Sequence, residues 1–416
     1  KLLQKSYHSK VKMIYIDPPY NTGGDFVYPD DFHDSLENYK KITGQVDDNG
    51  NRISTNTETS GRYHTDWLNM MYPRLRLARN LLTDDGVIFI SIDDNEVDNL
   101  KKICNEIFGE DNFVAQMVRK AKTGAAHDSG NLAIEYEYCL VYCKSLQYLS
   151  LNQEVVDVEK DDKYRLEDEF FKRRGKYYLR DLDYKGSYST SLDYPITTPN
   201  GTVLWAGGKQ GPPNTWRWSK SKVEWGLKNG FIVFKGDKVY IKQYQFVDNN
   251  DERRIRTLPY RAYMEFLNGE ATQEVKALVG DSFSYPKPVS MLRYLLQIST
   301  NIDAIILDFF SGSSTTAHAT MQLNAEDGGN RKFIMVQLPE PTDEKSEAHK
   351  AGYMNICEIG KERIRRAGEK IKEEKGLEAQ SLDIGFKVLK LDTSNIRKWQ
   401  PDYDNLEQSL LDYVDN

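Results

Sequence analysis

The sequence has no apolar stretch near the roughly 20 residues needed to cross a bilayer, and its N-terminal residues show no signal-peptide pattern. It has only 4 cysteines in 416 residues, and none has partners at the spacing of a zinc finger. Histidines are also few, and His64, His127 and His318 lack the spacing typical of metal ligands. We therefore expect a soluble cytoplasmic protein with reduced thiols and no metal site.

Positive charge is scarce overall but concentrated in the middle of the chain. The formal net charge is −7, yet residues 163–261 contain 20 Lys and Arg against 11 Asp and Glu, which leaves −16 for the rest. A basic segment between acidic ends is typical of a local nucleic-acid-binding surface. A solvated basic face without a ligand is the alternative.

An apolar run at residues 13–16 leads directly into Asp17, Pro18, Pro19 and Tyr20. The run predicts a short buried strand. The prolines predict a stiff turn, because proline fixes φ near about −65° and has no N–H. A carboxylate, a free carbonyl and an aromatic ring at one turn suit the binding of an exocyclic amine on a flat ring. A turn that only ends a strand is the alternative.

A second turn of this kind lies almost 300 residues later. Residues 304–307 predict another buried strand, followed by the turn 308–312 and a helix that begins near Ser313 or Ser314. Gly312 lets the backbone approach a ligand closely, and the helix N-terminus offers N–H groups to a carboxylate or phosphate. Strand, glycine turn and helix form half of a nucleotide-binding unit, although a loop without a ligand remains the alternative.

Together the two turns resemble the paired signature of amino-group DNA methyltransferases. The catalytic turn comes first and the cofactor turn last, which is similar to the β class, a circular permutation of the usual methyltransferase order. Further segments narrow the resemblance to the Mod (methyltransferase) subunit of type III restriction-modification systems. These segments are residues 21–23, 26–32, 61–75, 86–96 and 330–340.

The resemblance implies an α/β fold with a Rossmann-like methyltransferase sheet and an inserted target-recognition domain of mixed structure. It implies transfer of a methyl group from S-adenosyl-L-methionine to N6 of adenine in duplex DNA, after the base has flipped out of the helix. It also implies a Mod homodimer and a separate ATP-dependent Res subunit that cleaves DNA. No segment of this chain resembles a nuclease or helicase motif.

The resemblance also assigns roles to residues of the first turn. Asp17 and the Pro18 carbonyl accept the N6 hydrogens and localise the nitrogen lone pair, and Tyr20 stacks on the base. With Pro19 they form the expected catalytic set.

A second set is expected to bind the cofactor. Asp308 is assigned to the methionine amino group and Phe310 to packing against the ligand. Ser314 stands where the common pattern has a second glycine, and Gln337 stands where many relatives have an acid for the ribose. The full expected cofactor set is Asp308, Phe309, Phe310, Gly312, Ser314, Thr316, Lys287 and Gln337.

The middle of the chain supplies the expected DNA-binding residues. Arg217 stands between two tryptophans, and Arg253, Arg254 and Arg256 form a cluster. Arginine can bind guanine through two hydrogen bonds and can also bind phosphate.

Composition and the alternation of expected strands and helices divide the chain into four parts. Residues 1–145 form the first part of the methyltransferase domain, and residues 283–400 complete it with the cofactor turn. Residues 146–282 form the recognition domain, and residues 401–416 are a tail or the start of a further region. Within the first part, residues 43–62 are a candidate lid, with a disordered connector as the alternative. Because the family has more sequence before and after, the chain resembles a fragment.

Two other functions compete with adenine methylation. The first is N4-cytosine methylation, for which serine more often stands at the position of Asp17. The second is a catalytically inactive, DNA-binding specificity subunit. Methylation of an amino group in protein or RNA is a weaker enzymatic alternative.

Overall fold

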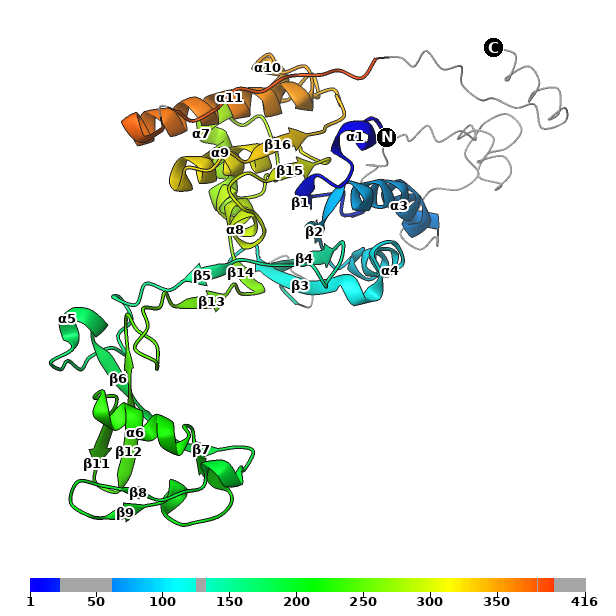
Figure 1. Ribbon diagram of the computed structural model, residues 1–416. Helices are drawn as coiled ribbons and strands as arrows, with labels where there is room; N and C mark the ends of the chain where they lie inside the picture. The colour runs from blue at the N-terminus through cyan, green and yellow to red at the C-terminus, as the bar shows by residue number, and fades with distance from the viewer. Residues whose placement is uncertain (23–61, 125–131, 380, 393–416) are drawn as a thin grey trace. The chain divides into compact units, whose positions relative to one another are not determined.

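The computed structural model describes residues 1–22, 62–124, 132–379 and 381–392 (Figure 1). The chain divides into two compact units, Lys1–Asn152 with Arg261–Asn416, and Gln153–Tyr260. Each unit has a hydrophobic core of its own. The predicted tail at residues 401–416, His127 and almost all of the candidate lid lie outside the described residues.

The first unit is built on a seven-stranded sheet with the strand order β14-β3-β4-β2-β1-β15-β16. The neighbours β2, β1, β15 and β16 run parallel, β14 is parallel to β3, and β4 is antiparallel to both β2 and β3. The strands are β1 (Val11–Ile16), β2 (Leu82–Ile92), β3 (Phe113–Lys120), β4 (Tyr136–Cys143), β14 (Tyr263–Glu265), β15 (Ile305–Asp308) and β16 (Lys332–Met335).

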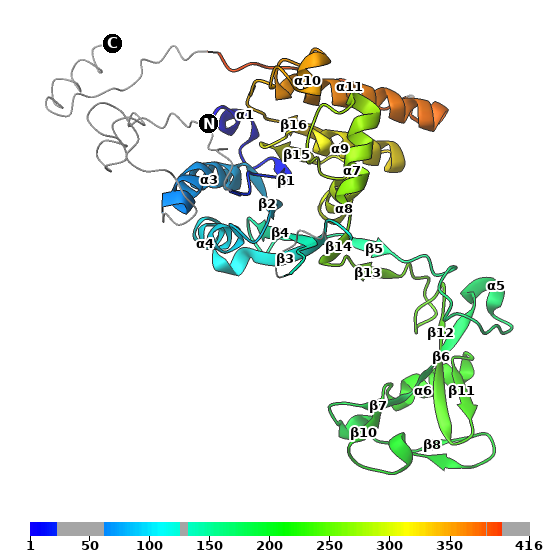
Figure 2. The same ribbon diagram turned by 180° about the vertical axis from the view of Figure 1, so that it is seen from behind.

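Helices cover both faces of this sheet, which is why β1 is apolar and almost fully buried along its length. The helices α3 and α4 lie on one face, and α8, α9 and α11 lie on the other (Figures 1 and 2). In α3, Trp67, Met71, Leu75 and Ala78 recur at helical spacing and enter the core beneath the sheet. The helices are α1 (Leu2–Tyr7), α3 (Arg62–Leu81), α4 (Val97–Phe108), α7 (Asn268–Val279), α8 (Val289–Ser299), α9 (Thr315–Asp327), α10 (Glu347–Lys350) and α11 (Ile356–Lys375). None of the helices among the described residues is long and apolar enough to cross a membrane.

The predicted α/β class is confirmed, and the two buried strands next to the turns lie where expected. The polar residues 83–86 do not form a separate turn between helix and strand, because β2 begins at Leu82, directly after α3. Leu82 pairs with Val11 of β1, and a bulge between Val11 and Met13 accommodates the extra residues.

The second unit, Gln153–Tyr260, has a small core of its own around the sheet β11-β12-β6. Trp216 and Trp218 belong to this core. The elements of the unit are β5 (Gln153–Val155), α5 (Phe171–Arg174), β6 (Tyr177–Asp181), β7 (Asp183–Lys185), β8 (Ile196–Thr197), β9 (Val203–Leu204), β10 (Asn214–Trp216), α6 (Lys220–Lys228), β11 (Ile232–Lys235), β12 (Lys238–Tyr244) and β13 (Thr257–Pro259).

This unit is shorter at both ends than the insert expected at residues 146–282. At its C-terminal side, β14 joins the large sheet through β3. Val275 and Leu278 of α7 then share a core with Ile359 and Ile364 of α11. The change in composition therefore begins before the unit itself and continues past its end.

Candidate active site

The two predicted turns meet at the C-terminal ends of two adjacent strands of the large sheet. β1 and β15 are adjacent and parallel, with Met13 opposite Ile306 and Ile14 opposite Leu307. Both turns follow the C-terminal ends of these strands. From this pair the sheet continues to β2 on one side and to β16 on the other (Figure 1). Such a reversal of strand order is where open α/β sheets form their ligand crevice.

A tryptophan of α3 anchors the catalytic turn through a hydrogen bond. The Trp67 indole N–H donates a hydrogen bond of 2.7 Å to the Pro19 carbonyl. No described residue donates to the Pro18 carbonyl. The Pro19 carbonyl therefore anchors the turn to α3.

The exit from this turn is also fixed. Asn21 has a left-handed backbone, with φ of 57°, and its side-chain amide donates to Glu96 at 2.6 Å. Glu96 is fully buried and also contacts His64 Nδ1 at 2.6 Å and the side-chain amide of Asn99 at 3.0 Å. A buried carboxylate with several polar partners holds the chain directly after Tyr20 in place.

Lys287 lies against the catalytic turn. Its Nζ is 2.9 Å from Asp17 Oδ1 and donates a hydrogen bond of 2.9 Å to the Tyr20 hydroxyl. The ammonium also lies 4.9 Å from the centre of the Tyr20 ring. The sequence had assigned Lys287 to the cofactor, but its contacts in the structure are with the residues expected to hold the base.

Two further charged residues, Glu137 of β4 and Arg119 of β3, extend this group. Glu137 Oε1 lies 3.6 Å from Lys287 Nζ and accepts a hydrogen bond of 2.8 Å from Arg119 Nε. Both side chains are buried. Sequence reasoning missed them, although an acid within the otherwise apolar run 136–143 was a usable signal.

This charged group sets the protonation of Asp17. Burial is the largest influence and raises the pKa of the Asp17 carboxyl; Lys287 lowers the pKa and Glu137 raises it further. The net direction is upward. Asp17 is therefore a stronger proton acceptor than an ordinary surface aspartate.

The cofactor turn is ordered by Asp308 and Gln337. Asp308 accepts a hydrogen bond of 3.1 Å from the Phe310 N–H and one of 2.6 Å from the Thr316 hydroxyl. Burial raises the pKa of Asp308 to about 7, and nearby Asp17 contributes in the same direction. Gln337 accepts a hydrogen bond of 2.8 Å from the Gly312 N–H. The side-chain oxygen expected to bind ribose thus supports the turn.

The glycine of this turn is required by its backbone. Gly312 has φ of 49°, and a Cβ there would lie 3.0 Å from the Phe283 ring. Ser314 also has a left-handed conformation, with φ of 64° and ψ of 38°. Ser314 therefore keeps the backbone of the glycine that it replaces, despite the strain of a side chain there.

Helix α11 supports this turn from behind. A Cβ on Gly360 would lie 2.7 Å from Ser314 Oγ and 3.2 Å from the Gly312 carbonyl oxygen. Arg363, fully buried, donates hydrogen bonds of 2.6 Å to Ser313 Oγ and 2.7 Å to Thr315 Oγ1. The space left by Gly360 is the space that the Ser314 side chain occupies.

A hollow of about 250 Å³ opens beside the cofactor turn. Phe309, Phe310 and Gln337 line one side, and residues of α1 and α3 line the other. The lining is mostly apolar, which suits an aromatic ring more than a charged group.

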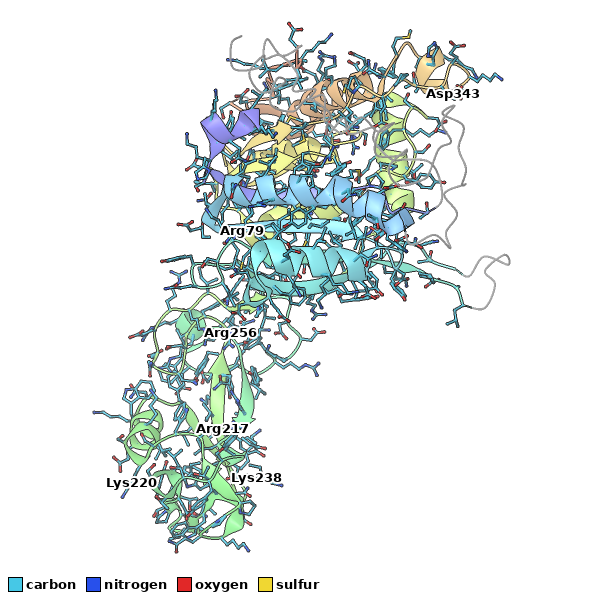
Figure 3. All side chains as sticks on the ribbon, turned by 90° about the vertical axis from the view of Figure 1, so that its right-hand side faces the viewer. Arg79, Arg217, Lys220, Lys238, Arg256 and Asp343 are labelled. Carbon is cyan, nitrogen blue, oxygen red and sulfur yellow. The ribbon has the colours of Figure 1, made fainter. Side chains whose placement is uncertain are left out.

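The four candidate DNA-binding arginines belong to the second unit. Arg217 donates 3.0 Å to the Asp181 carbonyl and lies over the Tyr184 ring, and Arg256 donates 2.6 Å to the Tyr244 carbonyl. Figure 3 shows these two at separate places along the unit. Arg253 and Arg254 are exposed. Arg253 and Arg254 are thus the better placed to contact a ligand, while Arg256 stabilises its own unit.

Residues 11–369 match the sequence model of the DNA methylase family. This chain belongs to that family. Its fold, with the catalytic turn before the cofactor turn, agrees with the methyltransferase sheet expected from the sequence.

Three curated proteins are similar to this chain over most of its length. The StyLTI Mod subunit of a type III restriction-modification enzyme from Salmonella typhimurium is 39% identical over 391 residues, which cover 92% of this chain and 57% of the relative. The EcoPI Mod subunit of Escherichia phage P1 is 36% identical over 94% of this chain and 63% of the relative. The type II methyltransferase M.KpnI of Klebsiella pneumoniae is 31% identical over 86% of this chain and 82% of its own. The chain thus spans less than two thirds of the two Mod relatives.

Two of the three histidines considered as metal ligands lie among the described residues. His318 is buried in α9, and burial lowers its pKa to about 3, so it is neutral. His64 contacts Glu96. Among the described residues, no group of three or more His, Cys, Asp or Glu side chains could hold a metal ion.

The close approach of Ser314 to Gly360 predicts that substitutions at these two positions affect stability together. Gly360→Ala should lower the free energy of unfolding by about 1–3 kcal/mol, because a methyl group would overlap Ser314 Oγ. Ser314→Gly alone should stabilise by up to about 1 kcal/mol, since it relieves a left-handed non-glycine residue. In the Ser314→Gly background, Gly360→Ala should be clearly less harmful. Urea unfolding of the four proteins measures this, and strictly additive effects would contradict it.

Proposed function

We propose that this chain transfers a methyl group from S-adenosyl-L-methionine to N6 of adenine in duplex DNA. It would do so as the modification subunit of a type III restriction-modification enzyme. The observation that carries this proposal is the meeting of the two turns across the β1–β15 pair. A carboxylate, a free carbonyl and an aromatic ring there adjoin a glycine turn that opens a helix.

The residues of the cofactor turn fit the methyl donor. Asp308 is a buried acid at a strand end whose oxygens retain acceptor capacity for an ammonium group. The N-terminus of α9 suits a carboxylate. The apolar hollow beside Phe309 and Phe310 suits the adenosine part. When bound, S-adenosyl-L-methionine supplies a methyl group activated by its sulfonium, and the electron pair of the broken S–C bond remains on sulfur.

The catalytic turn would prepare the nitrogen that receives the methyl group. Lys287 pairs with Asp17 Oδ1 and so leaves Oδ2 to accept one N6 hydrogen, while the Pro18 carbonyl accepts the other. Two acceptors draw the N6 lone pair out of conjugation with the ring. Tyr20 would stack on the flipped base, a contact worth roughly 1–3 kcal/mol. Positioning then supplies much of the rate enhancement.

The second unit, Gln153–Tyr260, would read the DNA sequence as a target-recognition domain. Exposed Arg253 and Arg254 are the first candidates for contacts with bases or phosphates. As the resemblance to Mod subunits implies, the whole protein would act as a homodimer together with a separate Res subunit that cleaves DNA.

Identification of the methylated nucleoside tests this function directly. The protein is incubated with tritiated S-adenosyl-L-methionine and unmethylated duplex DNA of random sequence, and the DNA is then digested to nucleosides. Label should appear in N6-methyldeoxyadenosine. Label in N4-methyldeoxycytidine would favour the cytosine alternative, and cofactor binding without any label would favour an inactive specificity subunit.

Asp17→Ala should abolish methyl transfer and leave the affinity for S-adenosyl-L-methionine within about tenfold, which corresponds to about 1.4 kcal/mol. The reason is that Asp17 belongs to the base side of the site. Asp84→Ala, at a surface ion pair with Lys144, is the matched control and should keep full activity. Calorimetric titration and the transfer assay check both variants. Complete loss of cofactor binding by Asp17→Ala would show that the two sites have been divided wrongly.

The raised pKa of Asp308 predicts that cofactor binding depends on pH. With a pKa of about 7 in the free protein, Asp308 is largely protonated below that pH. The ammonium group of the cofactor favours the carboxylate, so binding should release a proton. Affinity should fall as the pH drops from about 7 to 5.5. Titration in buffers of different ionisation enthalpy measures the proton release. Asp308→Asn should bind more weakly and without this pH dependence, and an unchanged profile in that variant would exclude Asp308 as the source.

A further inference from the structure

We propose that Glu137 is the second partner of the Lys287 ammonium, and that it takes over when Asp17 accepts the proton lost from N6. This inference rests on the proposed function of the same site. It assigns a role in the reaction to a residue that the family signature segments do not contain.

The distances show an ammonium between two carboxylates. Lys287 Nζ lies 2.9 Å from Asp17 Oδ1 and 3.6 Å from Glu137 Oε1. Its third contact is the hydrogen bond to the Tyr20 hydroxyl. The Lys287 and Glu137 side chains are each only 10% exposed. A shift of the ammonium by less than about 1 Å would exchange the closer partner, given ordinary charge-assisted distances of about 2.7–2.9 Å.

Glu137 is fixed, whereas Lys287 is free to shift. The Arg119 guanidinium is 2.8 Å from Glu137 Oε1 through both Nε and Nη2. Its other hydrogen bonds go to the Phe266 carbonyl at 2.7 Å and to Asn268 Oδ1 at 2.7 Å. A planar guanidinium held at several points cannot follow a movement of Glu137. Lys287 is held through its ammonium alone, at Asp17 and Tyr20 among the described residues, and its four-carbon stem is flexible enough for a small shift between the two carboxylates.

The proton released in the reaction changes the charge balance beside Lys287. As the N6–C bond forms, N6 gains a positive charge and one of its two hydrogens must leave as a proton. Asp17 accepts it on a carboxylate oxygen and later passes it to water. During that interval Asp17 is neutral, and the Lys287 ammonium lies in a buried site without a charged Asp17. Glu137 is then the nearest carboxylate to Lys287 while it stays paired with Arg119, so its one negative charge partly offsets two cations until the proton leaves.

The charges around Asp17 agree with this division of roles. Lys287 from the loop before α8 lowers the pKa of Asp17, and Glu137 from β4 raises it. Among the described residues, Tyr15 of β1, Tyr20 of the turn, Cys139 of β4 and Asp308 of β15 also interact electrostatically with Asp17. Loss of the Glu137 charge should therefore make Asp17 more acidic and a poorer proton acceptor.

The decisive experiment compares Glu137→Gln with Glu137→Asp in the full chain. Single-turnover methyl transfer is measured with saturating tritiated S-adenosyl-L-methionine and unmethylated random-sequence duplex DNA. Glu137→Gln, which keeps the shape and the hydrogen bond to Arg119, should slow the chemical step about 100-fold. Cofactor affinity should stay within about threefold. The acid limb of the pH–rate profile should move to lower pH, because the pKa of Asp17 falls.

Glu137→Asp is the conservative variant that separates charge from structure. It keeps the negative charge but has a shorter side chain. If Glu137 acts through its charge, Glu137→Asp should transfer methyl groups faster than Glu137→Gln. If Glu137 has a purely structural role, Glu137→Asp should be the slower of the two. Glu135→Gln removes a charge at the start of the same segment and should leave the rate unchanged. A rate for Glu137→Gln equal to that of the wild type, or above that of Glu137→Asp, would overturn the inference.

A double-mutant cycle with Lys287→Met tests whether Glu137 acts through Lys287. In the Lys287→Met background, Glu137→Gln should add less than about threefold to the loss of rate. Fully multiplicative effects would overturn the inference while leaving the proposed function intact. Absence of any transfer by the wild-type protein would overturn both.

Discussion

The parallel pairing of β1 with β15 is the constraint on which the site depends. Each strand carries its functional turn at its C-terminal end, and parallel pairing forces both ends to the same edge of the sheet. Continuing the observed register from Ile14 and Leu307 brings Asp17 level with Phe310. A slip by one residue would turn the side chains of β1 to the opposite faces, and burial on both faces opposes such a slip.

The cofactor turn depends on elements that are distant in sequence. Gln337 at the end of β16 binds the Gly312 N–H, and α11 contributes Gly360 and Arg363 from the opposite side. These contacts explain how Ser314 can hold a backbone conformation that usually belongs to glycine. The turn is therefore shaped by its surroundings as much as by its own sequence.

The sequence was sufficient to predict the α/β class, the two buried strands and the two turns, because short apolar runs and proline or glycine turns are local signals. It was not sufficient for Lys287, Glu137 and Arg119. They come from a loop and from the antiparallel strands β3 and β4, and only strand pairing brings them to Asp17. The role of Gln337 was missed for a similar reason. A glutamine at a strand end fits a ligand contact or a backbone contact equally well, and its partner Gly312 lies 25 residues away.

The first and last residues of the insert could also not be predicted from composition alone. The basic segment 163–261 omits the acidic start of the second unit, and the unit Gln153–Tyr260 has an excess of only four positive charges, 20 Lys and Arg against 16 Asp and Glu. Recognition by this unit would therefore depend on where its arginines lie more than on its net charge.

The second unit is inserted into the chain at a part of the sheet that is separate from the β1–β15 pair. The insert leaves after β4 and returns at β14, and β14 lies at the edge of the sheet, four strands from β1. Neither β4 nor β14 is a direct neighbour of β1 or β15. The charged group at the catalytic turn does contact the segment that follows β14. Arg119, which binds Glu137 beside Lys287, also binds the Phe266 carbonyl and Asn268 directly after β14. The buried ion-pair group at the catalytic turn thus also fixes the backbone where the insert rejoins the sheet.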